Sequence, residues 1–297
     1  MGRSRSIQQG ATVRALLFLV LLLAPILSCS PPGGQGQGIG VVVTIPPLAE
    51  FVERVGAGQV SVTVMVPPGA SPHTYEPTPS QMVAVGQADM YVKVGTPVEF
   101  ELAWMGNIIE ANPAMLVVDS SQGIELIGGE GAEGHEGVDP HIWGSPQNAR
   151  VMVENICAGL IAIDPGNAAL YADNRDHYLK ELAILDGYFH CRLDGFTNRV
   201  FMTYHPAFGY LAEEYGLTQL AVEHEGKEPT PQVLQDSIDK AEQYHLHYVF
   251  VAPQFASDDS ETIASAIGGE TAPMDPLPRH YIATMGGIAD LLALELE

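Results

Sequence analysis

The stretch NAALYADNRDHYLKELAILDGYFHCRL, residues 167–193, decides the fold that the sequence predicts. It indicates one helix of about 27 residues, which would be about 40 Å long at 1.5 Å per residue. Such a helix is longer than most helices of globular proteins and suits a rigid connection between two lobes. Asp164-Pro165-Gly166 breaks the chain just before it, after another predicted helix over residues 146–163.

Strands and helices alternate on both sides of this long helix. The predicted strands lie at residues 41–44, 60–66, 90–94 and 115–118 before it, and at 199–203, 217–222, 248–252 and 270–274 after it. This alternation is typical of parallel sheets covered by helices. We therefore predict an α/β fold of two doubly wound parallel-sheet lobes joined by one long rigid helix. Glu-Pro-Thr-Pro follows the second strand of each half, at 76–79 and 228–231, which supports two similar lobes.

The first 30 residues read as a targeting segment. Three arginines precede an apolar run that ends in Ile-Leu-Ser-Cys at Cys29, as in a signal peptide. This ending resembles a bacterial lipobox, which predicts a lipid anchor on Cys29; an ordinary signal peptide with a chance cysteine is the alternative. The predicted parts are a lipoprotein signal peptide (1–28), a flexible tether (29–40), an N-terminal α/β lobe (41–163), the linking helix (164–195) and a C-terminal α/β lobe (196–297).

The chain is strongly acidic, with 13 basic and 36 acidic residues and a net charge of −23. Loss of the three arginines with the signal peptide would change −23 to −26. This charge excludes nucleic acid as the main partner, because a binder of polyanions needs clustered Lys and Arg. It suits a protein that attracts cations. Cys157 and Cys191 could form a disulfide in an exported protein or remain two buried thiols, and the sequence leaves both open.

Three of the ten histidines follow strands or precede helices, and Pro or aromatic residues flank each of them. His73 and His205 each follow a predicted strand, and His141 precedes the helix over 146–163. Ligands of open parallel sheets bind outside the carboxyl ends of the strands, so these imidazoles are candidate metal ligands. Asp275, after the last strand, would face the same crevice, although a turn-capping Asp is the alternative. Three imidazoles and one carboxylate suit tetrahedral Zn²⁺, whereas Mn²⁺ prefers more oxygen ligands.

Five motifs in sequence order resemble one family. They are PPGASPHTYEPTPSQ (67–81), DPHIW (139–143), YHPAFGYLAEEYGL (204–217), EGKEPTPQ (225–232) and MDPL (274–277). Together they look like the zinc/manganese-binding lipoproteins of ATP-binding-cassette (ABC) metal importers, the ZnuA/TroA-like family of cluster A-I. The resemblance covers about residues 40–295 and implies two α/β lobes on one long rigid helix, with metal held between the lobes.

The resemblance also implies ligands and partners. The positions that match the family's ligands are His73, His141, His205 and Asp275. Manganese-binding members tend to carry Glu at the position of His205, so this histidine favours Zn²⁺ as cargo, with Mn²⁺ possible. The implied partners are a permease and its ATPase, and the implied location is the extracytoplasmic face of the cell membrane, reached through Cys29. We expect a monomer. The loop 128–137 holds only His135, whereas zinc-binding members often carry many histidines there, which argues against an auxiliary site.

The leading hypothesis is a solute-binding protein that captures Zn²⁺ and delivers it to an importer, not an enzyme. Four protein ligands leave no open coordination position, which catalytic zinc needs. The sequence also lacks the G-x-S-x-G, H-E-x-x-H and phosphate-loop motifs. The alternative is a zinc hydrolase, in which the three histidines bind metal and Asp275 or Glu225 acts as base. A third hypothesis is a surface adhesin on the same scaffold.

Overall fold

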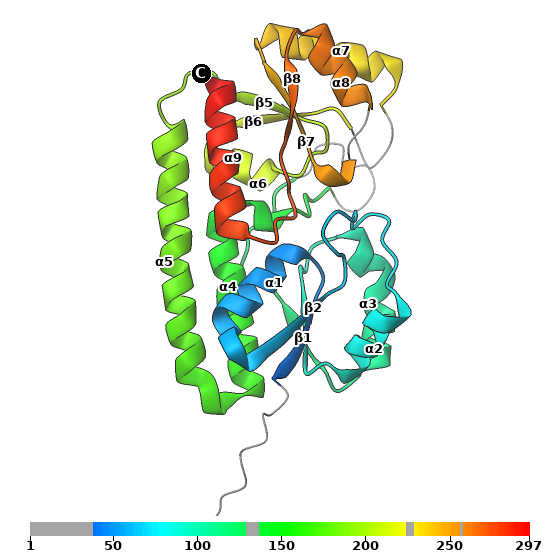
Figure 1. Cartoon of the computed structure of the whole chain (residues 1–297), viewed down its shortest axis with the longest axis vertical. Coiled ribbons are helices and arrows are strands. Elements are labelled where there is room, and N and C mark those ends of the chain that lie inside the picture. The colour runs from blue at the N-terminus through cyan, green and yellow to red at the C-terminus, as the bar shows by residue number, and fades with distance from the viewer. Residues whose placement is uncertain (1–37, 129–136, 224–228, 256–257) are drawn as a thin grey trace, which may run out of the picture. The chain divides into compact units, whose positions relative to one another are not determined.

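A computed structural model describes residues 38–128, 137–223, 229–255 and 258–297 (Figure 1). The predicted signal peptide, the proposed anchor Cys29, His135 and Glu225 lie outside the described residues. Within those four ranges, no helix combines the length and the apolar character needed to cross a bilayer.

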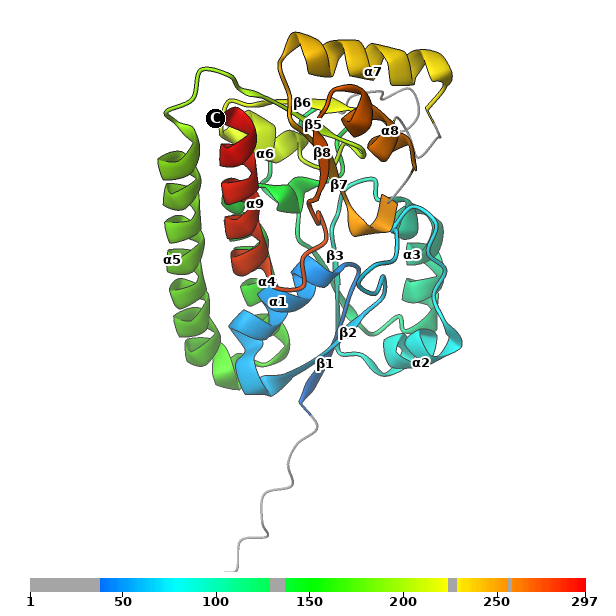
Figure 2. The ribbon, with the colours of Figure 1, turned by 45° about the horizontal axis from the view of Figure 1, so that its top comes forward.

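The first half of the chain forms a four-stranded parallel sheet with the strand order β2-β1-β3-β4. Its strands are β1 (Ile39–Val43), β2 (Val60–Val64), β3 (Met90–Lys93) and β4 (Leu116–Asp119). Its helices are α1 (Pro46–Gly56), α2 (Pro79–Gln87), α3 (Glu99–Ala111) and α4 (Pro146–Ile163). In Figures 1 and 2, α1 and α4 lie on one side of this sheet, and α2 and α3 lie on the other. Burial on both faces of the sheet explains the apolar runs in its inner strands β1 and β3.

The second half repeats this arrangement with the strand order β6-β5-β7-β8, again all parallel. Its strands are β5 (Val200–Thr203), β6 (Thr218–Ala221), β7 (Tyr248–Val251) and β8 (Glu270–Pro273). Its helices are α6 (Gly209–Glu214), α7 (Pro231–Gln243), α8 (Asp258–Ala266) and α9 (Tyr281–Leu296). The second strand lies at the edge in each sheet and the first strand lies next to it. The predicted fold class of two doubly wound parallel lobes is confirmed.

The long helix predicted from residues 167–193 is α5 (Ala168–Leu193), a continuous helix of 26 residues. It packs against α1, α4 and α9, which belong to both halves of the chain (Figure 1). Its buried side chains lie three, four or seven residues apart and therefore share one face. They are Tyr171, Tyr178, Leu182, Leu185, Phe189 and Leu193. The helix thus supplies one wall of a core shared by both lobes.

The helix starts follow from local chemistry that both lobes share. Thr78 and Thr230 cap α2 and α7, and each threonine hydroxyl accepts a hydrogen bond from a backbone N–H of the first turn. Proline occupies the first turn in both helices, where its missing N–H costs no helix hydrogen bond. The Glu-Pro-Thr-Pro repeat is therefore a helix-start signal at equivalent points of the two lobes.

The two cysteines of the described residues are free thiols. Cys157 is buried in α4, whereas Cys191 is exposed on α5. Neither alternative stated from the sequence holds in full, because the thiols are unpaired but only one of them is buried.

Candidate metal site

The structure brings together His73, His141 and His205, three of the four predicted ligands. One nitrogen from each imidazole lies within 4.8 Å of the corresponding nitrogens of the other two. His73 lies in the loop after β2, His141 just before α4 and His205 just after β5. Since two of them precede α5 and one follows it, the cluster draws on both halves of the chain.

The spacing of these nitrogens fits one tetrahedral ion. The Nε2 atoms of His73 and His205 are 3.3 Å apart. Two nitrogens that are each about 2.0–2.1 Å from a tetrahedral Zn²⁺ lie about 3.3–3.4 Å from one another. His141 and His205 are buried and His73 is half-buried, so an ion held here would be largely removed from water.

Each of the three imidazoles has a carboxylate behind it. The Nδ1 atom of His73 lies 2.9 Å from Glu99, that of His141 lies 2.8 Å from Asp139, and that of His205 lies 3.2 Å from Glu223. A carboxylate at Nδ1 fixes the hydrogen on that nitrogen and leaves the Nε2 lone pair for a metal. The Nε2 atoms of His73 and His205 face one another on the side of the rings away from these carboxylates.

Burial keeps one of these imidazoles neutral. Desolvation lowers the pKa of His205 to about 4, although the neighbouring Glu223 carboxylate acts in the opposite direction. At the rim, burial alone would raise the pKa of Glu99, but its contact with His73 outweighs this and the pKa is lowered. A neutral imidazole is the form that binds metal, so His205 is ready to bind at neutral pH.

The low pKa of His205 makes the stability of the metal-free protein depend on pH. The pKa is about 4 in the folded state and about 6.5 in the unfolded chain, so the unfolded state binds more protons between these values. Stability is fully present above about pH 6.5 and falls as the pH approaches 4, by at most about 3 kcal/mol from this group.

Urea titrations of the chelated wild-type protein and of His205→Gln at pH 7.5 and 4.5 check this prediction. The wild type should lose more unfolding free energy than the variant over this interval. Equal losses would contradict a depressed pKa at His205.

Asp275, the fourth predicted ligand, does not belong to the cluster of nitrogens within 4.8 Å. It is half-buried after β8, and its Oδ1 accepts hydrogen bonds from Gln254 Nε2 at 3.0 Å and from the Leu277 backbone at 2.9 Å. The bond from Leu277 caps a local turn, which is the alternative role of Asp275 considered from the sequence. Its role as a ligand stays a prediction.

Trp143 of the DPHIW motif connects the histidine cluster to the segment that carries Asp275. Its indole nitrogen donates to the carbonyl of Pro276 at 2.6 Å, and its own carbonyl accepts from the Tyr281 hydroxyl at 2.8 Å. The indole ring also packs edge-on against His141, with ring centres 5.3 Å apart. One buried side chain thus links His141 to the loop after β8.

Phe255 covers two of the imidazoles. Its ring stacks on His205 with the centres 4.2 Å apart and lies 5.7 Å from the ring of His73. This contact limits the rotation of His205 and adds apolar surface beside the cluster.

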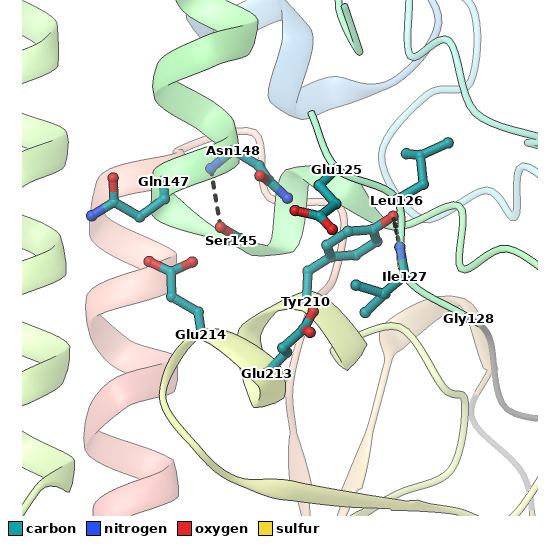
Figure 3. A pocket seen from close by; sticks show the side chains of 10 residues that line it. All are labelled: Glu125, Leu126, Ile127, Gly128, Ser145, Gln147, Asn148, Tyr210, Glu213 and Glu214. Carbon is teal, nitrogen blue, oxygen red and sulfur yellow. Dashed lines mark hydrogen bonds between the residues drawn. The ribbon is translucent and has the colours of Figure 1, made fainter. Parts of the chain in front are cut away.

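A pocket of about 570 Å³ lies elsewhere in the described part of the chain. Figure 3 shows its polar lining, which includes Glu125, Ser145, Tyr210 and Glu214. The Tyr210 hydroxyl accepts from the backbone of Ile127 and donates to the carbonyl of Asp139. None of the four predicted metal ligands lines this pocket.

The three carboxylates behind the histidines are not among the residues predicted from the sequence. The Asp-x-His spacing of Asp139 and His141 was visible in the sequence. Glu99 and Glu223 gave no local signal, because their histidines lie 26 and 18 residues away in the chain. Glu223 reaches His205 because β5 and β6 are neighbours in the sheet.

Fold and cluster together define a class: two-lobed α/β binding proteins with a metal-binding group contributed by both lobes. Comparison with known proteins makes this specific. The family model described as "Zinc-uptake complex component A periplasmic" matches residues 41–293, and the chain belongs to this family. It is the solute-binding component of an ABC metal importer, and the hydrolase hypothesis is wrong.

Individual relatives agree with this assignment. The high-affinity zinc uptake system protein ZnuA of Bacillus subtilis is 29% identical over 286 residues, which cover 90% of this chain and 88% of that protein. The manganese-binding lipoprotein MntA of Halalkalibacterium halodurans is 29% identical, with 86% of each chain covered. A crystal structure of ZnuA is 35% identical with a TM-score of 0.83, and the match covers 88% of this chain and 100% of that one.

Proposed function

We propose that this protein captures Zn²⁺ with His73, His141, His205 and Asp275 and passes it to the permease of an importer powered by an ATPase. The observation that carries the proposal is the convergence of three imidazole nitrogens within 4.8 Å, each with a carboxylate at its Nδ1. Three nitrogen donors and one oxygen donor fill a tetrahedral site. Such a site binds its cargo without an open position for catalysis.

The location follows from the same family. Extracytoplasmic capture suits a periplasmic uptake component, and we propose that Cys29 carries the lipid that holds the protein at the membrane. Residues 29–40 would then act as the tether, and the protein would work as a monomer. The adhesin hypothesis stays a hypothesis, and no contact among the described residues favours it.

The donor set predicts which metal binds best. Imidazole nitrogens bind Zn²⁺ more tightly than Mn²⁺, and three of the four proposed ligands are imidazoles. We expect the protein to be purified with zinc when no metal is added, and to bind Zn²⁺ at least about 100-fold more tightly than Mn²⁺.

Metal analysis followed by competition between the two ions at equal free concentrations checks this prediction. Displacement of bound Zn²⁺ by an equal concentration of Mn²⁺ would contradict the proposed cargo. An absence of any binding at one equivalent would contradict the site itself.

A further inference from the structure

Glu223 is the most buried of the three carboxylates behind the histidines. Its side chain is 4% exposed, and its partner His205 is 5% exposed. By contrast, the Glu99 side chain is 44% exposed as a whole, although its Oε2 beside His73 is buried. The Glu223–His205 pair is therefore the most buried of the three pairs.

The contacts of Glu223 account for no structural role. Its Oε2 lies 3.2 Å from Nδ1 of His205, and its Oε1 is buried without a hydrogen-bond partner among the described residues. Asp139 differs, because its Oδ1 accepts from both the backbone and the ring of His141 and so also shapes the local turn. A carboxylate buried with one oxygen unpartnered is unfavourable for folding. Its presence is explained if it serves its histidine.

The sheet fixes the distance between the two residues. They follow the neighbouring strands β5 and β6, and the parallel pairing continues beyond both strands through hydrogen bonds from Val222 to Thr203 and from Glu223 to Tyr204. The His205 ring is covered on its face by Phe255 and meets Glu223 at its Nδ1 edge. Its remaining nitrogen, Nε2, faces His73.

We propose that Glu223 is the positioning residue for His205: it accepts the hydrogen of His205 Nδ1 and thereby fixes Nε2 as the metal-binding atom of this ligand. This inference rests on the proposed zinc-binding function. Without the carboxylate, the hydrogen of His205 can occupy either nitrogen, and the tautomer with hydrogen on Nε2 cannot bind metal. Loss of such a partner typically weakens metal binding by 10–100-fold.

The test compares Glu223→Ala, Glu223→Gln and the wild type in Zn²⁺ titrations with a competing chelator. Glu223→Ala should bind Zn²⁺ about 10–100-fold more weakly. Glu223→Gln should recover part of this loss, because its amide oxygen can accept the same hydrogen. The visible spectrum of the Co²⁺ complex should change in Glu223→Ala, since one imidazole is no longer held in place, and should return toward that of the wild type in Glu223→Gln.

A second measurement separates positioning from folding. Thermal unfolding of each metal-free variant is measured beside its zinc affinity, because Glu223→Ala also leaves the buried Nδ1–H of His205 without its acceptor. A variant that stays folded at the temperature of the titration and still binds zinc more weakly supports positioning. Glu295→Gln is the matched control, because Glu295 is a buried carboxylate that accepts from the backbone of His247 and Tyr248 and, among the described residues, forms no hydrogen bond with the three histidines of the cluster. It should lower stability and leave zinc affinity unchanged.

The outcomes distinguish this inference from the proposed function. If the wild type binds zinc and Glu223→Ala binds it within about threefold of the wild type, with an unchanged Co²⁺ spectrum, the positioning role alone is overturned. Failure of the wild type to bind zinc would instead overturn the proposed function on which it rests.

Discussion

Replacing His141 with alanine is expected to weaken zinc binding by at least about 100-fold. This loss exceeds the typical effect of removing a residue that only supports a ligand, because a direct metal–nitrogen bond disappears. His141 is buried, and its Nδ1 is bonded to Asp139, so its other ring nitrogen is the one that the metal would lose. The ion would keep two imidazoles, those of His73 and His205.

The loss is measurable as a change in thermal or chemical stability. A ligand specific for the folded state at 1,000 times its Kd stabilises that state by about 4 kcal/mol, and at its Kd by about 0.4 kcal/mol. For a variant that binds about 100-fold more weakly, the same zinc concentration is only about 10 times its Kd, so it should keep at most about 1.4 kcal/mol of the stabilisation by zinc in a denaturant titration.

His177→Ala is the matched control, because His177 is exposed on α5 and lies outside the cluster. It should keep the stabilisation by zinc that the wild type shows. Equal stabilisation of His141→Ala and the wild type would remove His141 from the site.

Replacing Trp143 with alanine is expected to destabilise the protein by about 3–5 kcal/mol, the usual range for a large buried aromatic side chain. Trp143 is 2% exposed, and its indole donates to the carbonyl of Pro276. The variant would leave a cavity between the DPHIW motif and the loop after β8, and it would also leave that carbonyl without its donor.

Urea unfolding of the chelated protein measures this change without any contribution from zinc. Trp143→Phe should show a smaller loss, since it keeps most of the ring volume and removes only the donor. Trp104→Ala, at a half-buried tryptophan of α3, controls for the loss of an aromatic residue and should cost less. Equal losses at the two tryptophans would contradict a special structural role for Trp143.

The fold could be predicted from the sequence because its signals are local. Proline and threonine mark the starts of α2 and α7, and the strands are short apolar runs between turns. The observed bounds of the strands and helices differ from the predicted bounds by at most two residues. These differences arise because the ends of strands and helices depend on packing. The convergence of His73, His141 and His205 could also be anticipated, since ligands gather at the carboxyl ends of parallel strands.

The rest of the site depends on strand order, which local patterns do not specify. Glu223 meets His205 because β5 and β6 are adjacent, and nothing in the loop sequence distinguishes Glu223 from the acidic residues around it. The position of Asp275 relative to the histidines could not be predicted from local patterns either. Its neighbours Gln254 and Leu277 hold it in a turn, and its distance from the three imidazoles depends on how the loop after β8 lies on Trp143.

The central claim is that one zinc ion binds at His73, His141 and His205. The most direct measurement is an anomalous difference map at the zinc absorption edge from crystals of the zinc-loaded protein. We expect one dominant peak about 2.0–2.1 Å from a nitrogen of each of the three imidazoles. A dominant peak elsewhere, such as beside Glu125 and Glu214 in the pocket of Figure 3, with no peak among the histidines, would contradict it.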